Sequence, residues 1–328
     1  MSQPRRNIKP LRRWPVVPPV HNDEDPASII VRLAKHHFIT AHDLFHAYFG
    51  STASMLPDVG NHDNILKLVD MVAGYGIDFL NSVSWTRSPP KLVHFRGRAL
   101  PSHWIGEQRR VAPGVLAKDG DHPYVRLAWR FPAIAFDLAS QELLINHCPS
   151  CGKQLSWYQI QSVYRCQSCQ FDLRNCTPVV APQEFVEATR QLAGSIGLLP
   201  GKPLKLAYPF QTNDLPTTML VLEWCAHFDG LMRLDHTSQT VVNASRGLRV
   251  AETWPASLEL AVDLLFRQDR SEKFEFSVLQ PALKSLPTSE MRIEAMQQLA
   301  QIMLRPEFRE RERPPDYSRP RWKYFDAT

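Results

Sequence analysis

The apolar positions of this sequence first fall at helical spacing after residue 24. Asp25 and Pro26 are typical of a helix N-cap and first helical position, and apolar residues follow three and four positions apart. Thr40 is placed to cap a second helix, which Gly50 ends. Two short amphipathic helices joined by a tight turn predict a helix-turn-helix-like unit, and any other helical hairpin gives the same pattern.

The rest of the chain predicts further helices around a central segment of short strands. A helical pair is expected over 62–73 and 76–84. Val, Tyr, Trp and Phe cluster between turn residues over 91–136, which favours short strands. Helical spacing then returns, and we expect helices over 182–195, 215–228, 238–246, 255–267 and 288–304.

Four of the six cysteines fall into two CxxC pairs, Cys148 with Cys151 and Cys166 with Cys169. Zinc takes four ligands at tetrahedral corners, and a CxxC turn places two thiolates on one edge. Gly152 suits the positive φ angle that such a turn needs. The intervening segment is long enough for a hairpin that returns the second pair to the same ion. The spacing therefore predicts one structural zinc ion held by four thiolates.

The same cysteines disfavour a catalytic or a redox role for this site. Four thiolates close the coordination sphere and leave no position for water, so a catalytic zinc is disfavoured. A redox dithiol is disfavoured because one pair would suffice and no βαβ pattern surrounds it. Cys176 is expected to be a spare buried thiol, and Cys225 lies among apolar residues of a predicted helix.

Together these elements predict a mainly α chain with a small β and zinc-ribbon centre. An N-terminal helix-turn-helix-like unit comes first, followed by a central zinc ribbon and a C-terminal helical domain. We expect a basic, proline-rich arm (1–24), an N-terminal helical domain (25–110), the zinc-ribbon region (111–181), a C-terminal helical domain (182–304) and a charged tail (305–328).

Composition and charge add a candidate binding segment. The 328 residues suffice for two or three domains, and a hydrophobic fraction of 44% is that of a folded globular protein. The net charge of +5 is mild, but its distribution is uneven. Five basic residues precede the first acid, Asp23, and they predict either a solvated leader or contact with phosphates or an acidic partner surface: Arg5, Arg6, Lys9, Arg12 and Arg13.

Several functional classes are disfavoured. No run of about 18 apolar residues and no secretory leader is present, so we expect a cytoplasmic protein without a membrane partner. No P-loop, GxSxG or dinucleotide motif occurs. His42 and His46 have the spacing of a zinc-peptidase helix, which keeps a metal-dependent hydrolase open as an alternative. Asp43 stands where that motif has Glu, and no third ligand is evident.

Three stretches resemble the TniQ family of transposition targeting proteins, which is related to TnsD. The first is SIIVRLAKHHFITAHDLF, near the N-terminus. The second is the central block YVRLAWRFPAIAF, which runs into ELLINHCPSCGKQLSW and YRCQSCQFDLR. The third is the Trp254–Pro255 pair before a predicted helix.

The resemblance implies a non-enzymatic adaptor that links a target-recognition element to a TnsC-like AAA+ regulator. That element is target DNA or, in CRISPR-associated transposons, a guide-RNA Cascade complex, to which such proteins often bind as a dimer. The competing interpretation is a stand-alone nucleic-acid-binding regulator built from a helix-turn-helix and a zinc ribbon.

The resemblance also implies a lost metal site. Members of the family often carry a further ligand set upstream of the ribbon, whereas the matching positions here offer neither thiolate nor imidazole: Ala112, Val115, Asp137 and Ser140. Asp137 alone could coordinate weakly, and Pro113 and Asp119 match the surrounding pattern. We therefore expect this part of the chain to be held by packing, through Leu127, Trp129, Phe131 and Phe136.

Overall fold

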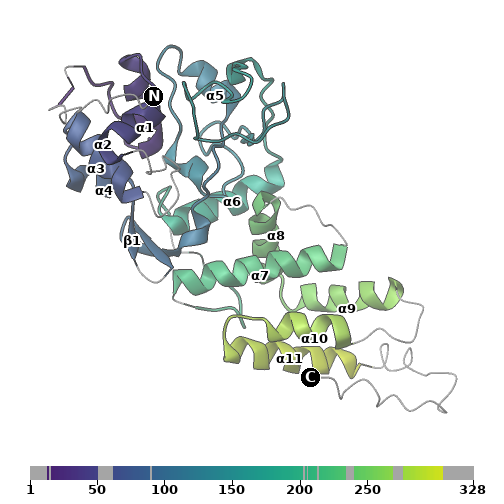
Figure 1. Ribbon diagram of the computed structural model, residues 1–328. Coiled ribbons are helices and arrows are strands. Elements are labelled where there is room, and N and C mark those ends of the chain that lie inside the picture. The colour runs from purple at the N-terminus through teal and green to yellow at the C-terminus, as the bar shows by residue number, and fades with distance from the viewer. Residues whose placement is uncertain are drawn as a thin grey trace, which may run out of the picture. The chain divides into compact units, whose positions relative to one another are not determined.

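The computed structural model describes residues 13–305 apart from 15, 51–61, 89–90, 202–203, 205, 213, 234–239 and 269–275. The chain divides into two compact units, Met1–Leu204 with Gln239–Ser245 and Lys205–Ser238 with Arg246–Thr328. The described residues are mainly helical and contain one small antiparallel sheet (Figure 1). The finer domain boundaries that the sequence predicts stay predictions.

The first unit begins with α1 (Pro26–His36), α2 (Ala41–Phe49), α3 (His62–Ala73) and α4 (Ile77–Val83). The predicted caps are confirmed, because the Asp25 carboxylate accepts from Ala27 N at 2.8 Å and the Thr40 hydroxyl accepts from Asp43 N at 3.0 Å. Gly50 ends α2 with a φ of 86°. Helix α1 packs against α2 and α3, and its apolar side chains are buried there.

The described part of the segment before α1 lies on these helices. Trp14 is buried and donates its backbone N–H to Val72 O at 3.0 Å. The Tyr75 hydroxyl donates to Pro18 O at 2.9 Å. From Trp14 onward the chain thus contributes to the core of the unit, and most of the predicted basic arm lies outside the described residues.

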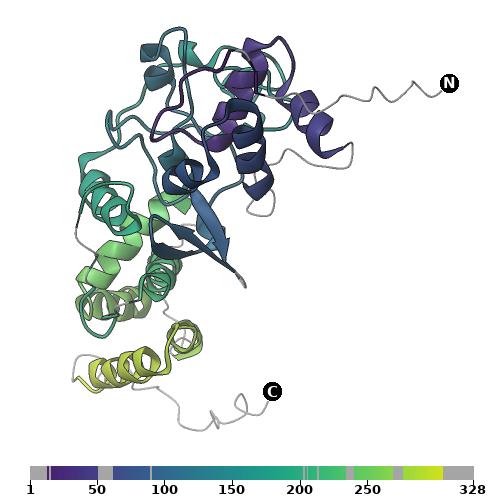
Figure 2. The same cartoon turned by 90° about the vertical axis from the view of Figure 1, so that its left-hand side faces the viewer.

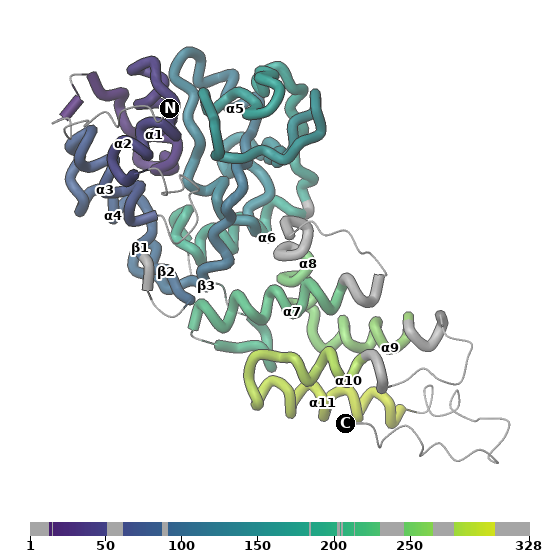
Figure 3. Tube along the Cα trace, in the orientation of Figure 1, coloured from purple at the N-terminus to yellow at the C-terminus, as the bar shows by residue number. Residues whose placement is uncertain are grey.

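Three short strands follow in the order β1 (Trp85–Ser88), β2 (Leu92–Phe95) and β3 (Arg98–Pro101), each antiparallel to the next (Figure 2). The prediction of strands over 91–136 is wrong beyond Pro101. There the chain forms a 3-10 turn at Ser102–Trp104, helix α5 (Pro113–Lys118), a second 3-10 turn at Leu127–Arg130, and isolated bridges. Figure 3 shows this part around α5 as mostly irregular coil.

The irregular coil is held by a buried side chain rather than by a sheet. Arg110 donates to the carbonyl oxygens of Trp129 at 2.8 Å and Ile134 at 2.9 Å, and it also donates to those of Phe131 and Pro132. Carbonyl groups that strand pairing would have satisfied are therefore taken by one guanidinium.

The last helix of this unit, α6 (Gln183–Ile196), ends against the sheet. Arg98 Nη1 donates to Gly194 O at 2.7 Å and also to Ser195 O, and Arg96 Nη1 donates to Gly197 O at 2.9 Å. Basic side chains at a helix C-terminus satisfy its free carbonyls and oppose the negative end of the helix dipole.

The second unit contains α7 (Leu215–Arg233), α9 (Ala256–Gln268), α10 (Phe276–Lys284) and α11 (Ser289–Met303), and α8 (Thr240–Glu252) crosses the division. Of these, α10 was not predicted. Trp254, just before α9, is buried against Phe210 with ring centroids 5.0 Å apart. None of the helices formed by the described residues is long and apolar enough to cross a membrane.

Candidate metal centre

The four cysteines of the two CxxC pairs lie together. Their Sγ atoms are all within 4.8 Å of one another, with Cys148 and Cys169 3.6 Å apart and Cys151 and Cys166 3.8 Å apart. A tetrahedral ion with Zn–S bonds of about 2.3 Å requires sulfur atoms about 3.8 Å apart, whereas a disulfide requires about 2.05 Å. The four thiols thus have the separation of a tetrathiolate metal site, and their donor type fits zinc.

Two turns of the same geometry present these thiols. In the first, Gly152 N donates to Cys148 O and Cys148 N donates to Lys153 O, both at 2.8 Å. In the second, Gln170 N donates to Cys166 O at 3.1 Å and Cys166 N donates to Phe171 O at 3.0 Å. Gly152 has a φ of 70°, as predicted, and Gln170 takes the same left-handed conformation at 60° without being glycine.

The segment between the turns anchors them to the core. Isolated antiparallel bridges pair His147 with Gln154 and Arg165 with Asp172, one bridge closing each turn. The apolar side chains between them belong to the same buried cluster as α1 and α3: Leu155, Trp157, Ile160 and Val163. The segment that joins the two turns is therefore packed into the core of the first unit.

The thiols differ in their surroundings. Cys148 and Cys166 are buried, and Cys151 and Cys169 are exposed. Burial raises the pKa of Cys148 to about 12, while the backbone N–H of Phe171 lowers the pKa of Cys169 to about 7. Since only thiolates bind the metal, binding must displace protons and weakens as the pH falls.

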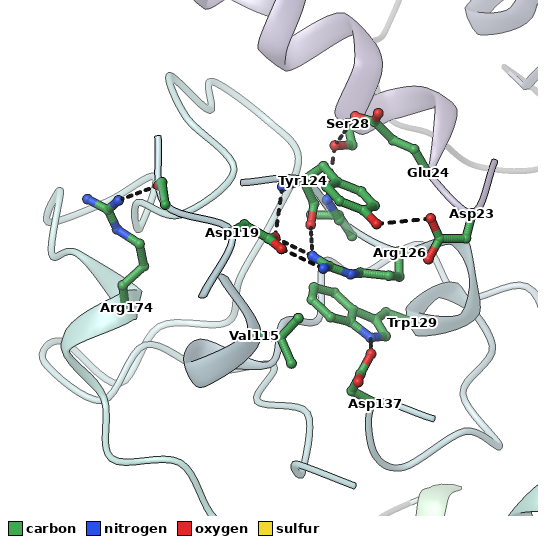
Figure 4. Close-up of polar contacts among 12 residues, drawn as sticks. Asp23, Glu24, Ser28, Val115, Asp119, Tyr124, Arg126, Trp129, Asp137 and Arg174 are labelled. Atoms are coloured by element: carbon green, nitrogen blue, oxygen red, sulfur yellow. Dashed lines mark hydrogen bonds and ion pairs between the residues drawn. The ribbon is translucent and has the colours of Figure 1, made fainter. Parts of the chain in front are cut away.

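Two carboxylates contact the positions at which the family resemblance implies a further metal site. Glu142 accepts from Gly114 N at 2.7 Å and from Val115 N at 3.0 Å, which caps α5. Asp137 accepts from Trp129 Nε1 at 3.1 Å and Ser140 N at 2.8 Å (Figure 4). Its oxygens are thus engaged, and among the described residues only the four cysteines form a cluster of three or more potential ligands.

Asp119 forms an ion pair with Arg126. Its carboxylate makes two hydrogen bonds with Arg126, one of 2.6 Å, and the Arg126 guanidinium lies 3.9 Å from the ring centroid of Tyr124 (Figure 4). The Tyr124 hydroxyl donates to Asp23 at 3.0 Å, and Val125 N donates to the Ser28 hydroxyl at 3.0 Å. These contacts fasten the start of α1 to the central region.

The predicted packing of this region is confirmed. No more than 1% of the surface of each of its four apolar residues is exposed: Leu127, Trp129, Phe131 and Phe136. Sequence reasoning missed the buried arginines Arg109, Arg110 and Arg130. Arg109 and Arg110 directly follow Glu107 and Gln108, and such a polar stretch gives no indication in the sequence that its arginines are buried.

The remaining candidate residues lie apart from the metal centre. The rings of His42 and His46 lie with their centroids 3.9 Å apart and tilted by 45°, and the described residues supply no third ligand to them. Cys176 is half-buried and outside the cluster, and burial raises the pKa of both Cys176 and Cys225.

Of the predicted basic cluster, only Arg13 is described, and it lies beside Gly74 at the end of α3. Arg5, Arg6, Lys9 and Arg12 lie outside the described residues. Their contact with phosphates or a partner remains a prediction.

Residues 15–136 match the family model TniQ. The match ends before the first cysteine of the metal centre. No curated protein matches the chain.

Proposed function

Because the chain belongs to the TniQ family through its residues 15–136, we propose that it is a non-enzymatic targeting adaptor of a DNA transposition system. Family membership makes it a transposition-associated protein. In the proposal it links a target-recognition element, either DNA or a guide-RNA Cascade complex, to an AAA+ regulator of the TnsC type.

The observation that carries the proposal is the family match. The matched segment holds α1 to α5 and the small sheet, and it is fastened to the ribbon beyond it. Lys35 on α1 donates to the Tyr164 hydroxyl at 3.0 Å, with its Nζ 4.6 Å from the ring centroid. A ribbon fixed in this way suits a scaffold that presents the N-terminal helices to partners.

The proposal assigns one zinc ion to Cys148, Cys151, Cys166 and Cys169. Four sulfur donors at tetrahedral separation leave no coordination position for water, so the ion stabilises the fold and supplies no hydrolytic chemistry. Metal analysis of the purified protein should return one zinc ion per chain. Cys148→Ser should lose it and Cys176→Ser should keep it, whereas two ions in the wild-type chain would contradict the loss of the upstream site.

The adaptor role is tested with an AAA+ regulator of the TnsC type. We expect the wild-type chain and Cys176→Ser to retain that protein in a pull-down and to support targeted insertion in a transposition assay. Cys148→Ser should fail in both because the ribbon no longer folds. Full, correctly targeted insertion without the chain would overturn the adaptor role, and tight DNA binding under that outcome would favour the stand-alone regulator.

The basic N-terminus is tested by deleting residues 1–12, which leaves the buried Trp14 in place. If Arg5, Arg6, Lys9 and Arg12 contact phosphates or an acidic surface, the deletion weakens binding and flattens its dependence on salt. Unchanged affinity with an unchanged salt slope would show that this segment is only a solvated leader.

A further inference from the structure

Arg109 makes hydrogen bonds to the chain next to both cysteine turns. Its backbone N–H donates to Leu155 O, just after the first turn, at 3.3 Å. Its guanidinium donates to Val163 O at 3.1 Å and Arg165 O at 2.8 Å, and also to Ser162 O and Gln167 Oε1, all leading into or within the second turn. One residue therefore spans the two halves of the ribbon.

The charge of Arg109 is not matched by an acidic side chain. Its side chain is fully buried, and within the described residues it forms no ion pair with a carboxylate. All its acceptors are neutral oxygens, and its Nε has no hydrogen-bond partner. Placing a cation in the interior without a counter-charge is energetically unfavourable.

The counter-charge available to Arg109 is sulfur. The Arg109 guanidinium donates to Arg165 O and Gln167 Oε1, the residues on either side of Cys166. Cys166 is buried, as is Cys148. These are the two buried members of the cluster, which water cannot stabilise as it stabilises the exposed pair. A divalent zinc ion with four thiolates carries a net charge of about −2, and this charge is least screened on the buried side.

We propose that Arg109 is the counter-cation of the zinc centre and the positioning residue that holds its two cysteine turns at ligand distance. The inference rests on the proposed zinc ion. It assigns to a residue of the TniQ-matched segment a direct part in the stability of a metal centre that lies beyond the match.

Arg110 is a matched control for Arg109. Its side chain is also buried, at 9% exposure, and it also donates only to carbonyl oxygens. Those carbonyls lie in residues 129–134, and the charge that acts on it is Arg130 rather than a cysteine. A change at Arg110 therefore removes the same kind of buried contact while leaving the contacts of the cysteine turns in place.

The test compares Arg109→Gln with Arg110→Gln, and Arg109→Lys with Arg110→Lys. Zinc affinity is measured by competition with a chromogenic chelator, and the sulfur-to-metal charge-transfer band is recorded after replacement of zinc by Co²⁺. Arg109→Gln should bind zinc about 10- to 100-fold more weakly, as expected for loss of a group that supports metal ligands. Arg109→Lys should be intermediate, with a shifted Co²⁺ band, and both Arg110 variants should match the wild type.

Equal zinc affinity and identical Co²⁺ bands in the Arg109 and Arg110 variants would overturn the role of Arg109. If Arg109→Gln does not fold, the lysine pair decides by the same criterion. A wild-type chain that holds no zinc would instead overturn the proposed metal, and the two failures are therefore distinguishable.

Discussion

Replacing Glu142 should release the first turn of α5. Its carboxylate accepts from Gly114 N and Val115 N, and the N-cap residue Ala112 offers no side-chain acceptor of its own. A hydrogen bond to a charged group contributes about 1.5–3 kcal/mol, and loss of a helix cap costs about 1 kcal/mol. Glu142→Ala removes both bonds, so we expect a loss of about 3–5 kcal/mol. Glu142→Gln keeps one acceptor oxygen and should lose about 1–2 kcal/mol.

Amide hydrogen exchange is the most direct assay, because it reports the two N–H groups themselves. Exchange of the Gly114 and Val115 amides should accelerate strongly in Glu142→Ala and moderately in Glu142→Gln. Glu187→Ala is the control, since Glu187 is exposed and accepts only from Gln191 at 3.3 Å. If Glu142→Ala and Glu187→Ala exchange alike, the cap does not exist and the reasoning fails.

Gly114 gives an independent check on the same contact. A Cβ at this position would lie 2.7 Å from Glu142 Oε2 and 2.7 Å from Pro178 Cγ. Gly114→Ala should therefore cost about 1–3 kcal/mol in the wild-type background. It should cost less in Glu142→Ala, because one of the two clashes is gone and neighbouring changes do not add. If the effects of the two substitutions on stability were strictly additive, Glu142 would not contact the start of α5.

Three further predictions concern other sites. Burial, and then the charge of Arg130, lower the pKa of His62 to about 3, below the unfolded value near 6.5. The unfolded chain therefore binds the extra proton, so the free energy of unfolding is fully present above pH 6.5 and falls by about 2 kcal/mol by pH 5. Urea unfolding of His62→Gln should show a smaller fall over the same pH range, and an equal fall would refute this. Gln170→Gly should raise the melting temperature of the zinc-loaded protein, because a left-handed non-glycine residue costs about 1 kcal/mol; a lower melting temperature would contradict it. Arg98→Ala should remove the side-chain donor to the Gly194 and Ser195 carbonyls, lower stability by about 1–3 kcal/mol and speed exchange at the end of α6. Unchanged exchange would rule out this cap.

Local signals made the helices and the cluster of four cysteines predictable. Asp25, Pro26 and Thr40 act within a few residues of themselves, so their capping roles can be inferred from the sequence alone. The two CxxC pairs are equally local, and only their pairing needed the fold. Helix α10 was missed because Pro281, which normally interrupts a helix, lies inside it.

The failure over 102–136 has a long-range cause. Aromatic and β-branched residues favour strands only when a partner strand accepts their backbone hydrogen bonds. In this segment the carbonyl oxygens of Trp129 and Ile134 accept instead from Arg110, which lies 19 and 24 positions earlier in the sequence. Neither the burial of that arginine nor the capping of α5 by Glu142 leaves a local pattern, because both depend on residues brought together by folding.

The upstream region and the ribbon solve the same structural problem with different chemistry. Glu142 joins the turn at Ala112–Val115 to the chain after Asp137 through backbone N–H donors. A carboxylate can accept several hydrogen bonds but cannot draw four negative ligands together, as a divalent cation does. In the upstream region Asp137 and Glu142 supply acceptors that suit N–H groups. In the ribbon four thiols lie together, so our proposal assigns a cation to them and gives Arg109 a share in balancing their charge.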